Sequence, residues 1–115
     1  MHSREQTIRQ MLGKPVHIVI DRPVGYHHKG LIYPVNYGYV PGLPAGDGEE
    51  QDVYLLGISE PLEEFDGIVI GAVLRKDDVE DKLIAAPKGM CFTREEIFRA
   101  VHFVEQFFDS VVILA

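Results

Sequence analysis

Apolar and polar residues alternate along several short segments of the chain, and this alternation predicts β-strands that bury one side. It is clearest in residues 16–20, where Val16, Ile18 and Ile20 would share one face. Residues 52–56, 67–75 and 82–86 are also predicted to be strands, because they are short, rich in apolar residues and bounded by polar or turn-forming residues. Short strands at this spacing predict a barrel or a sandwich.

Two other segments repeat apolar residues at helical spacing. Residues 3–12 are predicted to form a short helix, and residues 93–108 a longer one that begins with the capping box of Thr93 and Glu96. The predicted architecture is α+β: a small, closed, mostly antiparallel β-barrel with a short N-terminal helix and a C-terminal helix, in one domain spanning residues 1–115. The wide apolar face of the second helix is compatible with a subunit contact, so a homo-oligomer is expected.

Composition fits a globular protein with a core, since 46% of the 115 residues are hydrophobic and 25% are charged. The net charge of −7 argues against nucleic acid and membrane surfaces as partners, because both are bound through Lys and Arg. The longest apolar run, residues 68–74, is far shorter than the roughly 20 residues that span a bilayer. The chain has a single cysteine, Cys91, and therefore no intrachain disulfide, which favours the reducing cytoplasm. Cys91 itself is expected to be buried.

The strongest chemical signal is an acidic segment that follows a rigid aromatic one. Residues 30–74 contain no Lys or Arg, and Asp47, Glu49 and Asp52 follow one another closely around the turn at Asp47-Gly48. Carboxylates held by a turn suit Mg²⁺, which takes oxygen ligands and keeps several waters, so the segment indicates a metal and phosphate site. By spacing alone, a solvated acidic loop is equally compatible with this pattern.

Residues 33–39, Tyr-Pro-Val-Asn-Tyr-Gly-Tyr, followed by residues 46–53, Gly-Asp-Gly-Glu-Glu-Gln-Asp-Val, closely resemble the soluble, Mg²⁺-dependent inorganic pyrophosphatases. The signature of that family runs Tyr-Pro-x-Asn-Tyr-Gly-Tyr and then Asp-Gly-Asp-x-x-Asp. The resemblance extends over residues 16–108 and implies an OB-like, five-stranded barrel. It also implies hydrolysis of diphosphate to two phosphates by direct attack of metal-activated water, with Mg²⁺ as the cofactor and diphosphate as the small-molecule substrate.

The resemblance further implies roles for individual residues. The implied metal ligands are Asp21, Asp47, Asp52, Asp77 and, because the register of the second acidic loop is ambiguous, either Glu80 or Asp81. Glu49 stands where the family has an Asp that helps to deprotonate the attacking water, and Tyr37 would lie beside that water. Lys82 and Tyr33 would bind phosphate. Taken singly, the tyrosines are also compatible with ordinary sheet aromatics, and residues 77–81 with a charged turn.

Several positions depart from the family pattern. Only residues 24–32 stand where the family has a hairpin bearing Lys, Glu and Arg, so the sequence indicates that this hairpin is deleted. Phe107-Phe108 replaces a Tyr-Lys pair that binds phosphate in the family. The candidates to replace these phosphate ligands are His27, His28, Lys29 and Arg75. Because losing such donors slows catalysis, two alternatives stay open: hydrolysis of another, larger phosphorylated compound, and a non-catalytic module that binds metal or phosphate.

Overall fold

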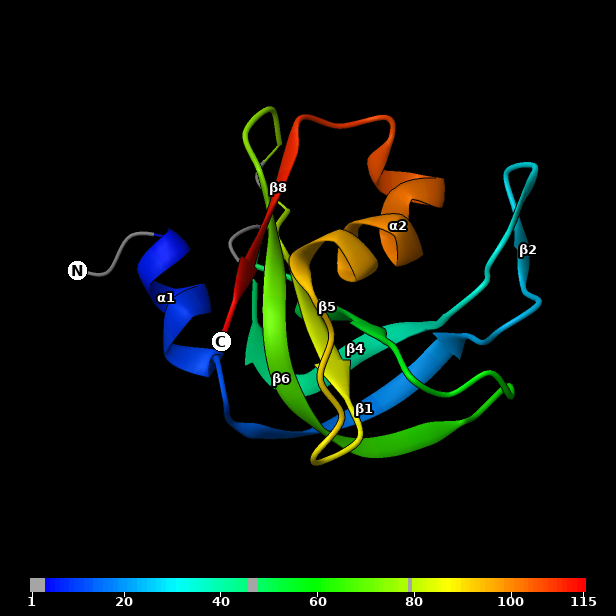
Figure 1. Ribbon diagram of the computed structural model, residues 1–115, viewed down its shortest axis with the longest axis horizontal. Helices are drawn as coiled ribbons and strands as arrows, with labels where there is room; N and C mark the ends of the chain where they lie inside the picture. The colour runs from blue at the N-terminus through cyan, green and yellow to red at the C-terminus, as the bar shows by residue number, and fades with distance from the viewer. Residues whose placement is uncertain (1–3, 46–47, 79) are drawn as a thin grey trace.

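The structure, a computed structural model, describes residues 4–45, 48–78 and 80–115 (Figure 1). In chain order the elements are α1 (Arg4–Met11), β1 (Pro15–Arg22), β2 (His27–His28), β3 (Leu31–Ile32), β4 (Asn36–Pro44), β5 (Glu50–Leu55), β6 (Glu64–Arg75), β7 (Lys82–Ala86), α2 (Arg94–Glu105) and β8 (Ser110–Leu114).

The longer strands form a closed barrel. Among the described residues the sheet order is β1-β4-β5-β7-β6-β8, and the pairing of β1 with β6 closes the sheet on itself. The strand pairs are antiparallel except for β5 and β7, which are parallel. β8 pairs with the C-terminal half of β6, whereas β1 pairs with the N-terminal half. The predicted closed, mostly antiparallel barrel with an N-terminal and a C-terminal helix is confirmed.

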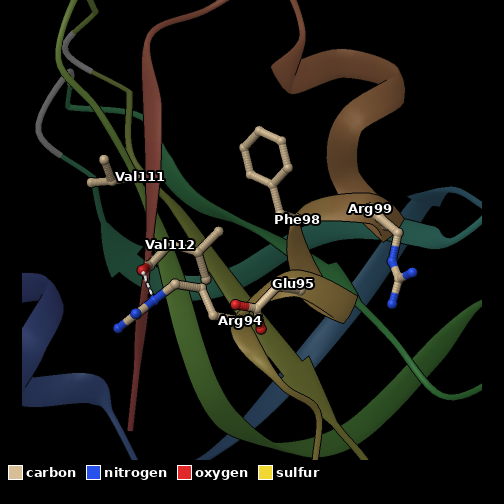
Figure 2. Close-up of a pocket in the computed structure, with 6 residues that line it drawn as sticks. All are labelled: Arg94, Glu95, Phe98, Arg99, Val111 and Val112. Carbon is tan, nitrogen blue, oxygen red and sulfur yellow. Dashed lines mark hydrogen bonds between the residues drawn. The ribbon is translucent and has the colours of Figure 1, made fainter.

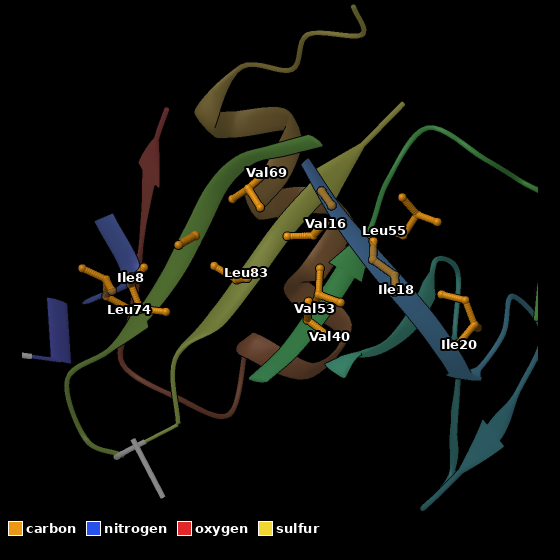
Figure 3. Packing of buried hydrophobic residues seen from close by; sticks show 12 residues of the cluster. Ile8, Val16, Ile18, Ile20, Val40, Val53, Leu55, Val69, Leu74 and Leu83 are labelled. Carbon is orange, nitrogen blue, oxygen red and sulfur yellow. The ribbon is translucent and has the colours of Figure 1, made fainter. Parts of the chain in front are cut away.

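Two apolar layers stabilise the barrel. The first fills its interior, where Ile18, Val53 and Leu83 are completely buried (Figure 3). The second lies between the outer face of the sheet and α2, where Ile97 and Val101 of the helix are completely buried. Neighbouring residues of β5 and β7 belong to different layers, because side chains alternate along a strand. Strands covered on both faces have almost continuous apolar sequences, as β7 and the C-terminal half of β5 do.

The predicted strands correspond to β1, β5, β6 and β7, and the predicted first helix to α1; each is confirmed, with small differences at the ends. The second predicted helix is three residues too long, because α2 ends at Glu105. There the backbone N–H groups of Phe107 and Phe108 bond carbonyls three residues earlier, which turns the chain out of the helix. β4 and β8 were not predicted.

A short hairpin remains where the sequence indicated a deletion. β2 and β3 pair antiparallel through a two-residue turn, in which Lys29 has φ 50° and Gly30 φ 79°. Two successive positive φ angles fit a type I′ turn, whose usual sequence is Asn-Gly rather than Lys-Gly. Figure 1 shows this hairpin projecting beyond the barrel on the same side of the molecule as the C-terminal end of α2.

Cys91 is exposed, so the expectation that it is buried is wrong. It lies in the segment without regular structure that joins β7 to α2, where its neighbour Phe92 is the residue that packs against the core. In the part of the chain that the structure describes, no helix has both the length and the apolar character needed to cross a membrane.

Candidate active site

A pocket of about 500 Å³, called the α2 pocket below, lies between the outer face of the barrel and the C-terminal end of α2. Its charged residues come from four strands and two loops: Arg22, Lys29, Asp52, Arg75, Glu80 and Lys82. Its aromatic and apolar residues are Tyr33, Tyr37, Tyr54, Leu31, Val104, Phe107 and Phe108, and His28 also lines it. Closure of the barrel thus brings distant parts of the sequence to one site.

Three side chains of this pocket hold the ammonium of Lys82. Its side chain is only 4% exposed, and its Nζ lies 2.6 Å from Asp52 Oδ2 and 3.1 Å from Glu80 Oε2. The same Nζ donates a hydrogen bond of 3.0 Å to the hydroxyl of Tyr37. These contacts follow from the pairing of the two strands, since Val53 of β5 is opposite Leu83 of β7. An ammonium fixed in this way is preorganised to face an anion.

Tyr37 lies beside Asp52 at the floor of the pocket. Burial, together with the negative charge of Asp52 and a hydrogen bond to it, raises the pKa of the Tyr37 hydroxyl well above its usual value. The hydroxyl therefore stays protonated at neutral pH and acts as a hydrogen-bond donor rather than as a base.

Arg22 also faces the pocket, although the sequence analysis did not select it. Its Nη1 donates a hydrogen bond of 2.7 Å to the hydroxyl of Tyr33, and its guanidinium lies 5.7 and 5.5 Å from the ring centres of Tyr33 and Tyr37. The pairing of β1 with β4 shifts by one residue between Ile20 and Arg22, a β-bulge. A bulge reverses the alternation of side chains, so Arg22 points to the outer face and not into the barrel with Ile20.

Arg75 lines the pocket but is already bound. Its Nε and Nη2 donate hydrogen bonds of 3.0 and 2.7 Å to the two carboxylate oxygens of Glu105, and Phe108 covers its guanidinium at 3.7 Å. Tyr54 and Ser110 donate to the same carboxylate at 2.8 and 2.6 Å. Burial alone would raise the pKa of Glu105, but these hydrogen bonds hold it below its usual value. Arg75 thus joins α2 to β6 as well as lining the site.

The acidic residues expected to bind metal are only partly brought together. Glu49 and Asp52 share a smaller hollow of about 210 Å³ with Tyr39 and Glu50, and Asp52 also lines the α2 pocket. Asp47 lies outside the described residues. Within residues 4–45, 48–78 and 80–115, no three His, Cys, Asp or Glu side chains gather as a metal cluster. The donor chemistry of Glu49 and Asp52 nevertheless suits Mg²⁺, which commonly uses one or two carboxylates together with substrate phosphates.

The second acidic loop places its carboxylates on different sides. Glu80 faces the α2 pocket, whereas Asp81 is 4% exposed and accepts a hydrogen bond of 3.0 Å from the backbone of Arg75. Arg4 of α1 lies 2.7 Å from the other oxygen of Asp81, and burial raises the pKa of this carboxyl despite these partners. Of the two alternatives left open by the sequence, Glu80 is therefore the one at the pocket.

The remaining acidic candidates lie outside the pocket lining. Asp77 is exposed and accepts a hydrogen bond of 3.1 Å from the backbone N–H of Asp109, so it holds the start of β8. Asp21 is exposed on the bulge of β1; partial desolvation is the main reason its pKa is raised, and the charge of Asp52 adds to the effect. Neither residue lines the two hollows in which the described part of the chain places Asp52, although the charge of Asp52 acts on Asp21.

The hairpin contributes His28 and Lys29 to the pocket, but not His27. Desolvation, with the positive charges of Arg22 and Lys29 nearby, lowers the pKa of His28, so this ring is neutral at pH 7. Two candidates to replace the missing phosphate ligands are positively charged and line the pocket, Lys29 and Arg75. Arg75 is paired with the buried carboxylate of Glu105, so Lys29 is the one whose charge is available to a phosphate.

No family model matches the chain. A curated relative, an inorganic pyrophosphatase from Caulobacter vibrioides, is 30% identical over 88 residues, and the match covers 65% of this chain and 48% of the relative. The chain thus spans about half the length of that relative.

Several solved structures share the fold. The inorganic pyrophosphatase of Ehrlichia chaffeensis superposes with a TM-score of 0.67 at 16% identity, covering 90% of this chain and 87% of that one. The enzyme of Neisseria gonorrhoeae gives 0.61 at 22% identity, covering 83% and 74%, and that of Helicobacter pylori gives 0.64 at 16%, covering 89% and 82%. The chain therefore has the inorganic pyrophosphatase fold, and the resemblance inferred from its motifs is confirmed.

Proposed function

We propose that the protein hydrolyses inorganic diphosphate to two phosphates with the help of Mg²⁺. The observation that supports this most directly is the position of Lys82, whose ammonium is held by Asp52, Glu80 and Tyr37 in a pocket that Arg22 also lines. Cations and a protonated hydroxyl in one pocket can bind phosphate oxygens, and the carboxylates next to them can hold the metal. The sequence similarity to a pyrophosphatase supports the same substrate.

Each group has a separate task in this proposal. Arg22, Lys29 and Lys82 bind the phosphate oxygens and oppose the negative charge that builds up during P–O cleavage. Tyr37 donates a hydrogen bond beside the attacked phosphorus, and Glu49 accepts a proton from the attacking water. Asp52, with Asp47, would hold Mg²⁺, which when bound lowers the pKa of water and neutralises phosphate charge.

The test is phosphate release from diphosphate by the purified protein, with and without Mg²⁺. Asp52→Asn is expected to lower the metal-dependent rate by at least about 10²-fold, since it removes a charged ligand. In the same assay Arg22→Gln is expected to lower kcat/KM by about 10- to 10²-fold. Glu63→Gln, an exposed carboxylate on the loop before β6, is the matched control and is expected to keep the wild-type rate.

Binding of Mg²⁺ provides a second readout that does not depend on turnover. Calorimetric titration is expected to show metal binding by the wild type and weaker binding by Asp52→Asn. Metal binding without any phosphate release would argue against hydrolysis of diphosphate and favour the non-catalytic alternative. Equal rates for wild type and Asp52→Asn would overturn the proposed site altogether.

We also propose that the protein acts in the cytoplasm as a homo-oligomer. An exposed, unpaired Cys91 favours a reducing compartment. For the oligomer, support comes from an apolar groove between α2 and β8, called the α2–β8 groove below (Figure 2). Phe98 of α2 and Val111 of β8 line this groove and are each 37% exposed.

A further inference from the structure

The α2 pocket is larger and more apolar than inorganic diphosphate requires. Its volume of about 500 Å³ lies within the range of roughly 300–1,000 Å³ that is typical of pockets for drug-sized organic ligands. A diphosphate ion is much smaller than such ligands and consists of oxygen and phosphorus alone. Part of the pocket therefore lies beyond the reach of the phosphates when Lys82 and Arg22 bind them.

One group of apolar residues in the pocket comes from a different part of the structure than the charged residues of the strands. Arg22, Asp52 and Lys82 belong to strands of the barrel, whereas Val104, Phe107 and Phe108 belong to the end of α2 and the turn after it. A ligand with its phosphates on the strands would extend its other end towards these apolar side chains. Such a ligand needs an organic group, because phosphate oxygens gain nothing from contact with Phe or Val.

Phe107 is the residue best placed to meet that group. It lines the pocket, yet its side chain is 66% exposed, the highest value among the large apolar side chains in the described part of the chain. Its neighbour Phe108 is instead packed on the guanidinium of Arg75 at 3.7 Å. An exposed aromatic ring at the edge of a polar pocket offers a stacking surface for a planar or apolar group.

We propose that this site takes organic diphosphates, that is, diphosphate monoesters whose planar or apolar group packs on Phe107. This inference rests on the proposed function, since it assigns a substrate class to the same phosphate-binding residues. In the reaction, the oxygen of water forms a bond to the terminal phosphorus while the bond from that phosphorus to the bridging oxygen breaks. The bridging oxygen leaves with the phosphate monoester, the terminal phosphorus leaves as inorganic phosphate, and the proton of water passes to Glu49 and then to solvent.

The experiment compares kcat/KM for inorganic diphosphate, a nucleoside diphosphate and an isoprenyl diphosphate under the same Mg²⁺ concentration. At least one organic diphosphate is expected to have a kcat/KM about tenfold or more above that of inorganic diphosphate. Which of the two is preferred distinguishes a planar base from an alkyl chain as the group on Phe107. Phe107→Ala is expected to lower kcat/KM for the preferred organic substrate by about tenfold and to lower the value for inorganic diphosphate by much less, so that the preference for the organic substrate falls.

Phe98→Ala is the matched control, because Phe98 is also an exposed Phe of the α2 region but lines the α2–β8 groove. It is expected to leave all three kcat/KM values as they are. Equal or lower kcat/KM for both organic diphosphates, with no effect of Phe107→Ala, would overturn the inference while leaving diphosphate hydrolysis intact. If no compound is hydrolysed, binding of the same three diphosphates is measured by calorimetry. Tighter binding of an organic diphosphate than of inorganic diphosphate, weakened by Phe107→Ala, supports the inference. Binding of the organic diphosphates that is no tighter overturns it.

Discussion

At the scale of single residues, the aromatic motif at residues 33–39 combines side chains for chemistry with side chains for structure. Tyr33 and Tyr37 line the α2 pocket. Asn36 is completely buried: its side chain accepts hydrogen bonds from the backbone of Val24 and Leu62 and donates one of 3.0 Å to the carbonyl of Glu60. This amide ties two loops to the start of β4 and thereby fixes where the two tyrosines point.

The buried pair of Arg75 and Glu105 leads to a prediction on stability. Both side chains are at most 4% exposed, so Glu105→Gln would leave a buried guanidinium without its carboxylate and is expected to cost about 3–5 kcal/mol of unfolding free energy. Chemical denaturation measures this loss. The double variant Arg75→Met with Glu105→Leu, which leaves no unpaired charge, is expected to recover much of it. A double variant that is less stable than Glu105→Gln would contradict this explanation.

The same pair predicts how stability depends on pH. Because the folded-state pKa of Glu105 lies below its unfolded value, the pair contributes fully above the unfolded pKa, near 4.5, and the contribution is lost as pH falls through the folded-state pKa. Wild-type protein is therefore expected to lose stability in acid more steeply than Glu105→Gln. Parallel slopes for the two proteins below pH 4.5 would show that Glu105 does not titrate as described.

At the scale of secondary-structure elements, alternation and capping predicted most of the barrel, and local irregularities account for what they missed. β8 (Ser110–Leu114) was not predicted because the apolar pattern of the helix was extended to residue 108, which left too few residues after it to suggest a strand. Arg22 was missed because a regular strand would place it in the barrel with Ile18 and Ile20, and only the bulge turns it outward. The sequence could not show which of Glu80 and Asp81 faces the pocket. Adjacent residues point to opposite sides, and which side each one takes depends on the conformation of the loop.

The contact between β1 and β4 predicts the effect of changing one glycine. A Cβ atom at Gly38 would lie 1.8 Å from the carbonyl oxygen of Val19, so Gly38→Ala would force the two strands apart. It is expected to cost more than about 3 kcal/mol, beyond ordinary overpacking, and to reduce the yield of folded protein. Gly13→Ala is the control: its φ is 82° but nothing lies within 4 Å, so a loss of only about 1–2 kcal/mol is expected. Similar losses at both positions would contradict the proposed clash.

At the scale of the whole molecule, the site depends on closure of the barrel, which the motifs alone do not specify. Asp52 and Lys82 are 30 residues apart in sequence, and Arg75 and Glu105 also 30, yet each pair forms an ion contact across the sheet or between sheet and helix. The resemblance to a family could predict which residues belong to the site, because it implies the fold that brings them together. The pairing of Arg75 with Glu105 could not be predicted, because no local pattern links the two residues and only the packing of α2 on the sheet brings them together.

The α2–β8 groove predicts that two copies of the chain associate. Its apolar residues Phe98 and Val111 lie beside Arg94, Glu95 and Arg99, so the groove carries both signs of charge, which an isologous contact between two copies can pair (Figure 2). Elsewhere a net charge of −7 makes identical copies repel.

Sedimentation of the wild type is therefore expected to show a dimer or larger assembly, and Phe98→Glu is expected to shift it to the monomer, because a charge would have to be buried without a partner. Ile32→Glu is the control, since Ile32 is 60% exposed but lies on the β2–β3 hairpin, outside the groove. A wild type that stays monomeric at all concentrations would show that the groove is not a subunit contact. An assembly that dissociates with Ile32→Glu and not with Phe98→Glu would show that the contact lies elsewhere. Because the α2 pocket and the groove involve different residues of the α2 region, loss of association is expected to leave kcat/KM for diphosphate unchanged.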